Sequence, residues 1–529
     1  MVSFILSYNS LNLIIYIFII NIYNKKMQSY TLYQASEFLR DRHPYIPDPN
    51  PRPLMDPEQV AIAYNERAVP KLADLLVYPP LSSQKRRDAL HTLNELVSHQ
   101  ETKCDMITNK IVLHATCLMV DKNPEVRFEA AYLVGSLLFL DVGRLQFDSL
   151  EGNYSIMQNL IFDPVTKVRE SVGWLLYRLS MHKDGTKMMN KSNTIYKIVD
   201  AFILYSTPTK IAENIYYLLY LLEAMINVSR YDYNINHMLK KGLLKSFNEI
   251  LFDENAQYSS ALSVGLYQQL RELILSTCKN VTLIVDGKVE AYKENLILTG
   301  AKFLSSELIN ERLYVSSMFM SISNILDSKK QICKFETVVN NVVHYEILEK
   351  ICALLEVKNK DVKEIMDIKE NSILCLRNLA EFPEGFLKII DILHEKLEIM
   401  NEVFGVDALK GLTELLPKLS KYKNPPHVEK ELLPKYSMVI KGIVYFYKKY
   451  QDDALDILIH DTVNINQKLG PFYLINDSNL HKYVKYLTER IGRKDPHNQQ
   501  ILVKFLEQYD GREKNISRDN DSLQLSEII

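Results

Sequence analysis

The segments RRDALHTLNELV (86–97), RFEAAYLVGSLL (127–138) and RESVGWLLYRLS (169–180) decide the fold of this 529-residue chain. Each segment begins with an arginine, and the three arginines are 41 and 42 residues apart. Small or apolar residues follow at matching offsets with helical spacing, and no stretch alternates with period two for long enough to predict a sheet. The chain therefore contains an internal repeat of helices.

A repeat of this length is typical of armadillo and HEAT proteins. Helix starts are predicted at Asn123-Pro124 and Asp163-Pro164, where an N-cap side chain precedes a proline, and Thr207-Pro208 continues the register. One such repeat cannot bury its own apolar face, so neighbouring repeats must stack. We therefore predict an all-α fold, an armadillo/HEAT-type helical-repeat superhelix (solenoid), with the repeat array over residues 57–420.

The other parts of the chain differ from this array in composition. Residues 1–26 are apolar, and we expect them to be dispensable for the working protein, with a short membrane anchor as the alternative. Residues 27–56 are predicted to form a proline-rich extended arm. Helical patterning resumes over 421–509, which predicts a C-terminal helical cap or an appended helical unit. The polar tail 510–529 is predicted to be disordered.

Composition narrows the classes of function. The chain has only 16 glycines and 19 prolines, and 47% of its residues are hydrophobic, which favours long helices. Its net charge of −2 gives no general attraction to nucleic acid or to a membrane surface. Nucleic acid is therefore not expected as a partner, and a membrane is expected only if residues 1–26 are retained. The six cysteines form no CxxC pair, which favours a reducing compartment such as the cytoplasm or the nucleus.

No motif for catalysis or cofactor binding is found. The chain has no GxSxG elbow, no GxxxxGK[ST] loop, no GxGxxG turn and no HExxH pair, and His91 and His99 lack the spacing of a helical metal site. Paired carboxylates such as Glu364 with Asp367 are typical of solvated helix faces. We therefore predict a protein that is not an enzyme and that has no cofactor, no metal site and no small-molecule substrate.

One phrase recurs late in the repeats and marks candidate binding residues. It consists of an apolar residue, any residue, asparagine and another apolar residue, and it places Asn227, Asn324 and Asn378 at comparable positions. In armadillo repeats this phrase falls on the third helix, whose exposed edge lines the groove. An amide there can bind the main chain of an extended peptide, although it can equally satisfy the end of a neighbouring helix.

Two other recurring residue types favour structure over binding. The repeated arginines Arg127 and Arg169 are expected to cap carbonyl groups or to pair with the previous repeat. Tyrosine is abundant, and Tyr216, Tyr217 and Tyr220 lie on one predicted helix. Tyrosine is favoured at protein interfaces, but core packing is the preferred interpretation for these three.

Several segments resemble the radial spoke head 14 homologs, which are armadillo-repeat proteins of the ciliary axoneme. They are DPEQVAIAYNERAVPKL (56–72), NPEVRFEAAYLVGSL (123–137), Val-Gly-Arg (142–144), DPVTKVRESVGWLLYRLS (163–180) and LAEFPEG (379–385). The resemblance implies a non-catalytic protein-binding subunit of the radial spokes, which help to regulate ciliary and flagellar motility. It also implies other radial spoke subunits as partners and a location in the cytoplasm, the cytoskeleton and the axoneme of the cilium or flagellum.

The main alternative is an armadillo-type cytosolic or nuclear adaptor similar to importin-α, or a regulatory subunit of a larger machine. An importin-α-like adaptor reads basic peptides with tryptophans and asparagines one helical turn apart in successive repeats. Here Trp174 is the single tryptophan, and Glu223 and Leu374 lie four residues before Asn227 and Asn378. This ladder is missing. The repeat register and the resemblance to the radial spoke proteins instead imply a rigid stack that holds an extended or helical segment of a neighbouring spoke subunit along its groove.

Overall fold

The computed structural model describes residues 68–77, 82–253, 255–334, 337–339, 342–344, 346–356, 362–416, 433–461, 468–469, 472 and 478–494. The chain divides into two compact units, Met1–Ile284 (unit 1) and Val285–Ile529 (unit 2). The predicted extension, arm and tail (1–26, 27–56 and 510–529) lie outside the described residues. The boundaries of the array at 57 and 420 and of the C-terminal unit at 421 and 509 stay predictions.

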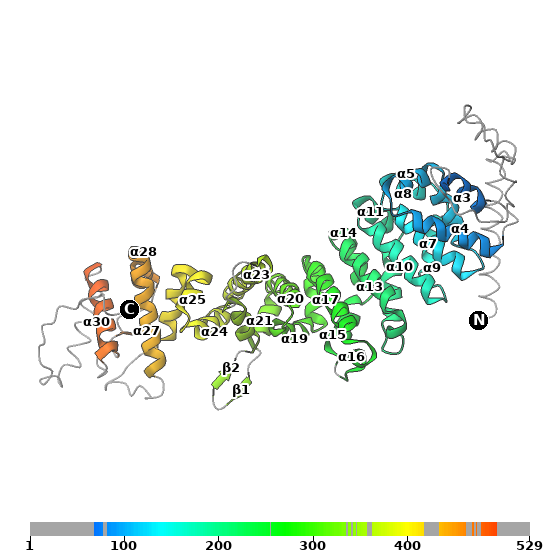
Figure 1. The fold of residues 1–529 in the computed structure, drawn as a ribbon. Coiled ribbons are helices and arrows are strands. Elements are labelled where there is room, and N and C mark those ends of the chain that lie inside the picture. The colour runs from blue at the N-terminus through cyan, green and yellow to red at the C-terminus, as the bar shows by residue number, and fades with distance from the viewer. Residues whose placement is uncertain are drawn as a thin grey trace, which may run out of the picture. The chain divides into compact units, whose positions relative to one another are not determined.

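Unit 1 alternates one long helix with shorter ones (Figure 1). The long helices are α4 (Ser83–Leu96), α7 (Pro124–Leu137), α10 (Thr166–Ser180), α13 (Ile211–Val228) and α17 (Val264–Val281). The shorter helices are α3 (Ala68–Val77), α5 (Gln100–Thr108), α6 (Ile111–Leu118), α8 (Asp141–Asp148), α9 (Asn153–Leu160), α11 (Lys183–Lys191), α12 (Thr194–Tyr205), α14 (Asp232–Leu239), α15 (Leu243–Phe252) and α16 (Gln257–Ala261).

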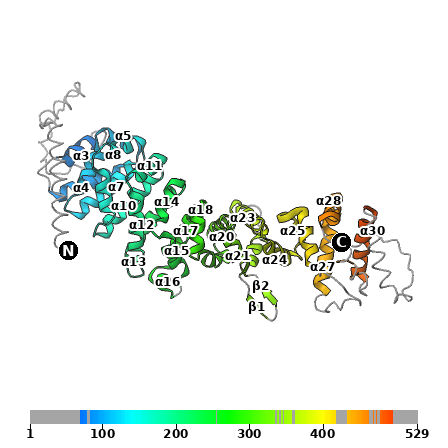
Figure 2. The ribbon, with the colours of Figure 1, turned by 180° about the vertical axis from the view of Figure 1, so that it is seen from behind.

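Each long helix of unit 1 packs against the next long helix along the chain, and α7, α10 and α13 are the most closely packed. Figure 2 shows the same succession from behind. We call the solvent-facing side of these five helices the long-helix face. The predicted helical-repeat solenoid is confirmed in this stacking of helix units, because each repeat buries its apolar side against its neighbours.

The core of unit 1 lies between the long helices and the shorter helices behind them. Leu133 of α7, Leu175 and Leu176 of α10 and Tyr217 of α13 are fully buried. The Tyr217 hydroxyl donates a hydrogen bond to the carbonyl oxygen of Ile161 at 2.8 Å, so this buried polar group has a partner. Tyr217 therefore belongs to the core, as predicted for the tyrosines of this helix.

The repeated arginines join successive long helices. Each one reaches the segment at the start of the next long helix, in the pairs Arg86 with Asp121 (2.8 Å), Arg127 with Asp163 (2.9 and 3.1 Å) and Arg169 with Asn214 (3.1 Å). Arg127 also donates to the carbonyl oxygen of Asp121 at 3.0 Å, and Arg169 donates to that of Asp163 at 2.6 Å. The predicted capping of carbonyls is confirmed. Pairing was predicted with the previous repeat, but each arginine pairs with the following one. The reason is that the segment leading into the next long helix lies beside the first turn of the long helix that carries the arginine.

The predicted helix starts are only partly confirmed. Asn123 is the N-cap of α7, its side chain accepts a hydrogen bond from the Glu125 amide at 2.9 Å, and Pro124 opens the helix. Helix α10 begins only at Thr166, because Asp163 accepts a hydrogen bond from the Val165 amide and forms a turn before the helix. In the third case Thr207-Pro208 also precedes the helix, since α13 begins at Ile211.

A glycine allows the sharp turn from a long helix into the short helix that follows. A Cβ atom on Gly185 would lie 1.9 Å from the carbonyl oxygen of Leu179, six residues earlier. Gly143 and Gly385 meet the carbonyls of Leu137 and Leu379 in the same way, at 2.3 and 2.5 Å. Because a Cβ atom would collide with the backbone at each of these three positions, these turns require glycine.

In unit 2 helices also pack side by side, with α20 against α23 and α27 against both α26 and α30. Its helices are α18 (Val285–Lys293), α19 (Leu296–Ala301), α20 (Ile309–Ile322), α21 (Leu326–Lys334), α22 (Glu346–Ala353), α23 (Lys363–Ala380), α24 (Pro383–Leu393), α25 (Leu397–Phe404), α26 (Ala408–Leu415), α27 (Leu433–Tyr450), α28 (Asp452–Asp456) and α30 (Ser478–Lys494). Short 3₁₀ turns lie at Phe303–Ser305, Leu354–Glu356 and Gly405–Asp407, and a π-helical turn lies at Ile457–Asp461.

Unit 2 also contains a small antiparallel hairpin that the sequence pattern did not predict. Strand β1 (Thr337–Val339) pairs with β2 (Val342–His344), and Val338 lies opposite Val343. Three residues per strand are too few to show a period of two in the sequence. The hairpin joins α21 to α22 and leaves the fold otherwise helical.

Candidate partner-binding surface

The three asparagines singled out from the sequence do not occupy equivalent positions. Asn227 lies in the last turn of α13 in unit 1, is buried, and donates from Nδ2 to the Ser180 hydroxyl of α10 at 3.1 Å. Its amide therefore links two neighbouring long helices. This contact matches the alternative that the asparagines satisfy neighbouring helix ends.

The other two asparagines belong to unit 2. Asn378 of α23 donates from Nδ2 to the carbonyl oxygen of Met320 at 3.1 Å and to the Ser323 hydroxyl at 3.0 Å, both at the end of α20. Asn324 lies beyond the end of α20 and is exposed. The shared phrase therefore falls inside one helix and outside another. That these three amides bind a partner stays a prediction.

Two further asparagines form the same kind of link. Asn280 of α17 donates to the Ser229 hydroxyl at 3.0 Å and to the carbonyl oxygen of Ile226 at 3.3 Å. It stands in Cys278-Lys279-Asn280-Val281, which fits the phrase used to select the other three. Asn94 of α4 donates to the carbonyl oxygen of Glu129 at 3.0 Å. Asn280, like Asn227 and Asn378, therefore contacts the preceding long helix through the phrase, whereas Asn94 stands outside the phrase and contacts the following one.

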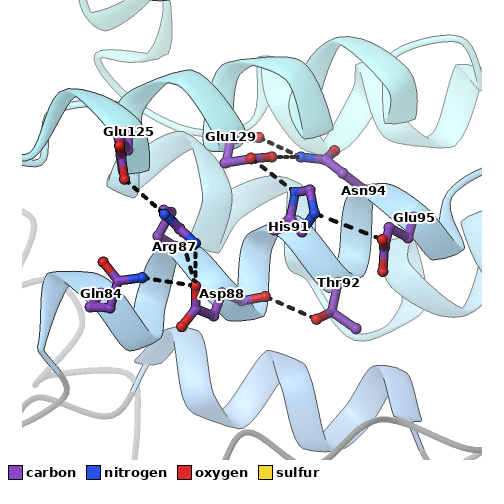
Figure 3. Close-up of polar contacts among 9 residues, drawn as sticks. All are labelled: Gln84, Arg87, Asp88, His91, Thr92, Asn94, Glu95, Glu125 and Glu129. Atoms are coloured by element: carbon purple, nitrogen blue, oxygen red, sulfur yellow. Dashed lines mark hydrogen bonds and ion pairs between the residues drawn. The ribbon is translucent and has the colours of Figure 1, made fainter.

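Figure 3 shows the polar seam between α4 and α7, to which Asn94 belongs. The Glu129 carboxylate accepts from Asn94 Nδ2 at 2.7 Å and contacts His91 Nδ1 at 3.1 Å. Arg87 pairs with Glu125 at 3.0 Å on the same seam. The carboxylates at this end of the long-helix face are therefore already bound within the protein.

On α7, α10 and α13 the long-helix face carries a group of aromatic side chains. Tyr132 stacks on Trp174 with ring centroids 5.6 Å apart, and Trp174 meets the edge of Tyr220 at 5.8 Å. Tyr177 lies 5.8 Å from Trp174 and stacks on Tyr220 at 6.4 Å. These rings come from three successive repeats and form one continuous cluster.

The cluster is only partly buried. Tyr132 is 37% exposed, and Trp174, Tyr177 and Tyr220 are intermediate. Tyr216, one turn before Tyr220 on α13, is 57% exposed. The preferred core interpretation is therefore wrong for Tyr216, whereas Tyr220 is partly buried against Trp174 and Tyr177. One helix carries tyrosines on both its buried and its solvent-facing side.

Two carboxylates adjoin the rings. Glu170 lies one turn before Trp174 on α10, and Glu223 lies one turn after Tyr220 on α13. Burial raises the pKa of both carboxyl groups. Nearby positive charges oppose this rise to a smaller extent, from Lys167 and Arg169 at Glu170 and from Arg230 at Glu223. Neither carboxylate forms a hydrogen bond or an ion pair with any residue that the structure describes.

The cluster already holds one cation. The Arg178 guanidinium lies 5.0 Å from the Trp174 ring centroid and 4.5 Å from that of Phe139. The indole Nε1 of Trp174 is buried and has no acceptor among the described residues. We call Tyr132, Trp174, Tyr177, Tyr220, Glu170 and Glu223 the aromatic–carboxylate surface.

The described residues contain no group of three or more histidine, cysteine, aspartate or glutamate side chains placed to hold a metal ion. All six cysteines are free, and burial raises the pKa of the Cys278, Cys352 and Cys375 thiols to about 12.

In the part of the chain that the structure describes, no helix combines the length and apolar character needed to cross a membrane.

Comparison with known proteins gives only loose structural likeness. No protein-family profile and no curated protein matches the chain. An engineered protein from a structural genomics consortium is 14% identical, with 85% of this chain and 95% of that chain covered and a TM-score of 0.49. A designed armadillo-repeat protein is 13% identical, with 48% and 99% covered and a TM-score of 0.40. Because the overlap is this loose, the assignment of the repeat fold rests on the helix stacking and cross-repeat contacts of the protein itself.

Proposed function

We propose that the protein is a non-catalytic scaffold that binds another protein on the long-helix face of unit 1. The aromatic–carboxylate surface is the observation that carries this proposal. Tyrosine and tryptophan are enriched where proteins associate, because their rings contribute large contact areas with few rotatable bonds. Tyr132 and Tyr216 leave such area open to solvent on α7 and α13, the long helices on either side of α10.

The partner in this proposal is a neighbouring subunit of the radial spokes, and the protein is a spoke component that supports the regulation of ciliary motility. Support comes from the resemblance of residues 56–72, 123–137 and 163–180 to the radial spoke head 14 homologs. The second and third of these segments include the starts of α7 and α10. The proposed surface and the resemblance therefore involve the same repeats.

The stacked helices explain how such a scaffold works. Repeats that are joined by buried pairs such as Arg127 with Asp163 hold their outward side chains at fixed spacing. A partner segment that lies across several repeats then finds a preorganised surface and gains affinity from each one. No chemical step is required of the protein.

The test is the location of the full-length tagged protein in a ciliated cell. The proposal predicts that it stays with detergent-extracted axonemes and co-purifies with radial spokes. A Tyr132→Ala/Tyr216→Glu variant should be lost from the axonemes, whereas Tyr233→Glu on α14, a tyrosine that is 44% exposed away from the long helices, should be retained. A soluble or nuclear wild-type protein would contradict the spoke assignment and favour the adaptor alternative.

A further inference from the structure

The chemistry of the aromatic–carboxylate surface specifies what kind of segment fits it. Aromatic ring faces carry negative electrostatic potential and attract cations, most strongly when the cation loses part of its hydration. Trp174 already shows this preference, because the Arg178 guanidinium lies 5.0 Å from its ring centroid. Arg178 follows Trp174 by one turn, so this internal cation lies on the C-terminal side of the ring along α10.

The N-terminal side of the same ring carries a carboxylate that forms no ion pair with the described residues, and Lys167 and Arg169 act on its charge only from a distance. Glu170 precedes Trp174 by one turn, and residues spaced in this way share one face of a helix. Burial raises the pKa of Tyr220 and the charge of Glu170 adds to this effect, and the Tyr220 ring lies 5.8 Å from that of Trp174. A cation bound here would contact both a carboxylate and aromatic faces.

Glu223 extends this pattern to α13. It follows Tyr220 by three residues and, like Glu170, is half-buried with no hydrogen bond or ion pair to the described residues. Partial burial of an unpaired carboxylate is costly unless a positive charge compensates for it. Two such carboxylates on adjacent helices, with aromatic rings between them, are complementary to a segment that carries more than one positive charge.

We infer that the aromatic–carboxylate surface binds a segment of the partner protein through arginine or lysine side chains that pair with Glu170 and Glu223 and lie against the rings. This inference rests on the proposed scaffold function and adds the chemistry of the partner. An arginine is well suited to the site, because its planar guanidinium stacks on aromatic rings while it donates hydrogen bonds to a carboxylate.

Trp174 is the single tryptophan of the chain, so its fluorescence reports on this surface directly. The experiment titrates the purified full-length protein with synthetic peptides in which serine alternates with arginine, with glutamine or with glutamate. Calorimetry measures the same affinities independently of the fluorescence. The arginine peptide should bind and change the Trp174 emission, and the glutamine and glutamate peptides should do neither.

Variants locate the binding. Glu170→Gln/Glu223→Gln should weaken arginine-peptide binding about tenfold, since each partly exposed ion pair contributes up to about 1 kcal/mol. Tyr132→Ala should weaken it about threefold through loss of a ring. The charge-matched control Glu101→Gln/Glu151→Gln changes two exposed carboxylates on the shorter-helix side of unit 1 and should leave the affinity unchanged. Circular dichroism and thermal unfolding of each variant establish that it remains folded.

Three outcomes would overturn the inference. They are equal binding of the arginine and glutamine peptides, no binding of any peptide, and equal effects of the two double variants, which would place the basic peptide elsewhere on the protein. If any of these is found while the tagged protein still co-purifies with radial spokes, the basic-segment inference fails and the scaffold function stands. If the peptide results are as expected but the protein is absent from axonemes, the spoke assignment fails instead.

Discussion

Replacing Asp163 by alanine should destabilise unit 1 by about 3 kcal/mol. The Asp163 side chain is 5% exposed and accepts two hydrogen bonds from Arg127, at 2.9 and 3.1 Å, and a third from the Val165 amide. Breaking a buried ion pair costs about 3–5 kcal/mol, because it leaves the other charge without a partner. The lower end applies here, since Arg127 is 14% exposed and keeps the carbonyl oxygens of Asp121 and Lys122 as acceptors.

The assay is urea unfolding of the full-length protein followed by Trp174 fluorescence, because this tryptophan lies on α10, the helix that Asp163 precedes. Asp200→Ala is the matched control, since Asp200 pairs with Lys241 and both side chains are more than one third exposed. That substitution should cost less than about 1 kcal/mol. In the Arg127→Ala/Asp163→Ala double variant the two losses should not add, because both single changes remove the same pair.

If Asp163→Ala and Asp200→Ala shifted the Trp174 transition by the same small amount, the buried arginine pairs would not be what joins the repeats. Fully additive losses in the double variant would lead to the same conclusion. The remaining contacts between α7 and α10 would then have to account for the stability of the stack.

Three further predictions concern the turn glycines, acid stability and the pH dependence of binding. Gly185→Ala should lower the free energy of unfolding by about 3 kcal/mol in urea melts, because its Cβ would collide with the Leu179 carbonyl oxygen. Burial, assisted by the charge of Lys110, lowers the pKa of His114 from 6.5 to about 4 in the folded protein. The folded state therefore favours the neutral imidazole, and stability is unaffected by this group above pH 6.5. The free energy of unfolding should fall by roughly 3 kcal/mol as the pH falls from 6.5 to 4, because the unfolded chain binds the proton more readily. His114→Leu should abolish this decrease. Binding of the arginine peptide should weaken as the pH falls through the raised pKa values of Glu170 and Glu223, because only their charged forms attract cations.

Each of these predictions has a control in the chain. Gly265→Ala should be tolerated, since its Cβ would meet nothing within 4 Å. His91→Leu is the matched histidine control, because the His91 side chain is 58% exposed. In Glu170→Gln/Glu223→Gln the pH dependence of peptide affinity should disappear. A Gly185→Ala protein as stable as wild type, an unchanged acid profile in His114→Leu, or a peptide affinity that does not depend on pH would contradict the respective prediction.

The helical repeat could be predicted from the sequence because the same residue types recur at the same positions of successive repeats. The arginines at 86, 127 and 169 share a role at the start of successive long helices, and Asn123-Pro124 marks the start of α7 as expected. The start of α10 was placed too early, because Asp163 uses its carboxylate for Arg127 and a turn. Local preference for an N-cap was overridden there by a contact with the preceding repeat.

The surface was harder to predict than the fold. A four-letter phrase could not show that Asn324 falls beyond the end of α20 while Asn378 lies inside α23, since helix ends depend on packing as well as on local sequence. The aromatic cluster was missed for a related reason. Tyr132, Trp174 and Tyr220 lie on three different repeats, and only the stacking of α7, α10 and α13 brings their rings together.

The most direct test of the scaffold function is photo-crosslinking in ciliated cells, with a photoreactive amino acid in place of Tyr216 on the long-helix face or of Tyr233 on α14. Both side chains are exposed, at 57% and 44%, so both positions accept the probe without disturbing the core. The proposal predicts crosslinks from position 216 to a radial spoke subunit, and few or none from position 233. Crosslinks only from position 233, or from position 216 only to proteins outside the axoneme, would contradict it.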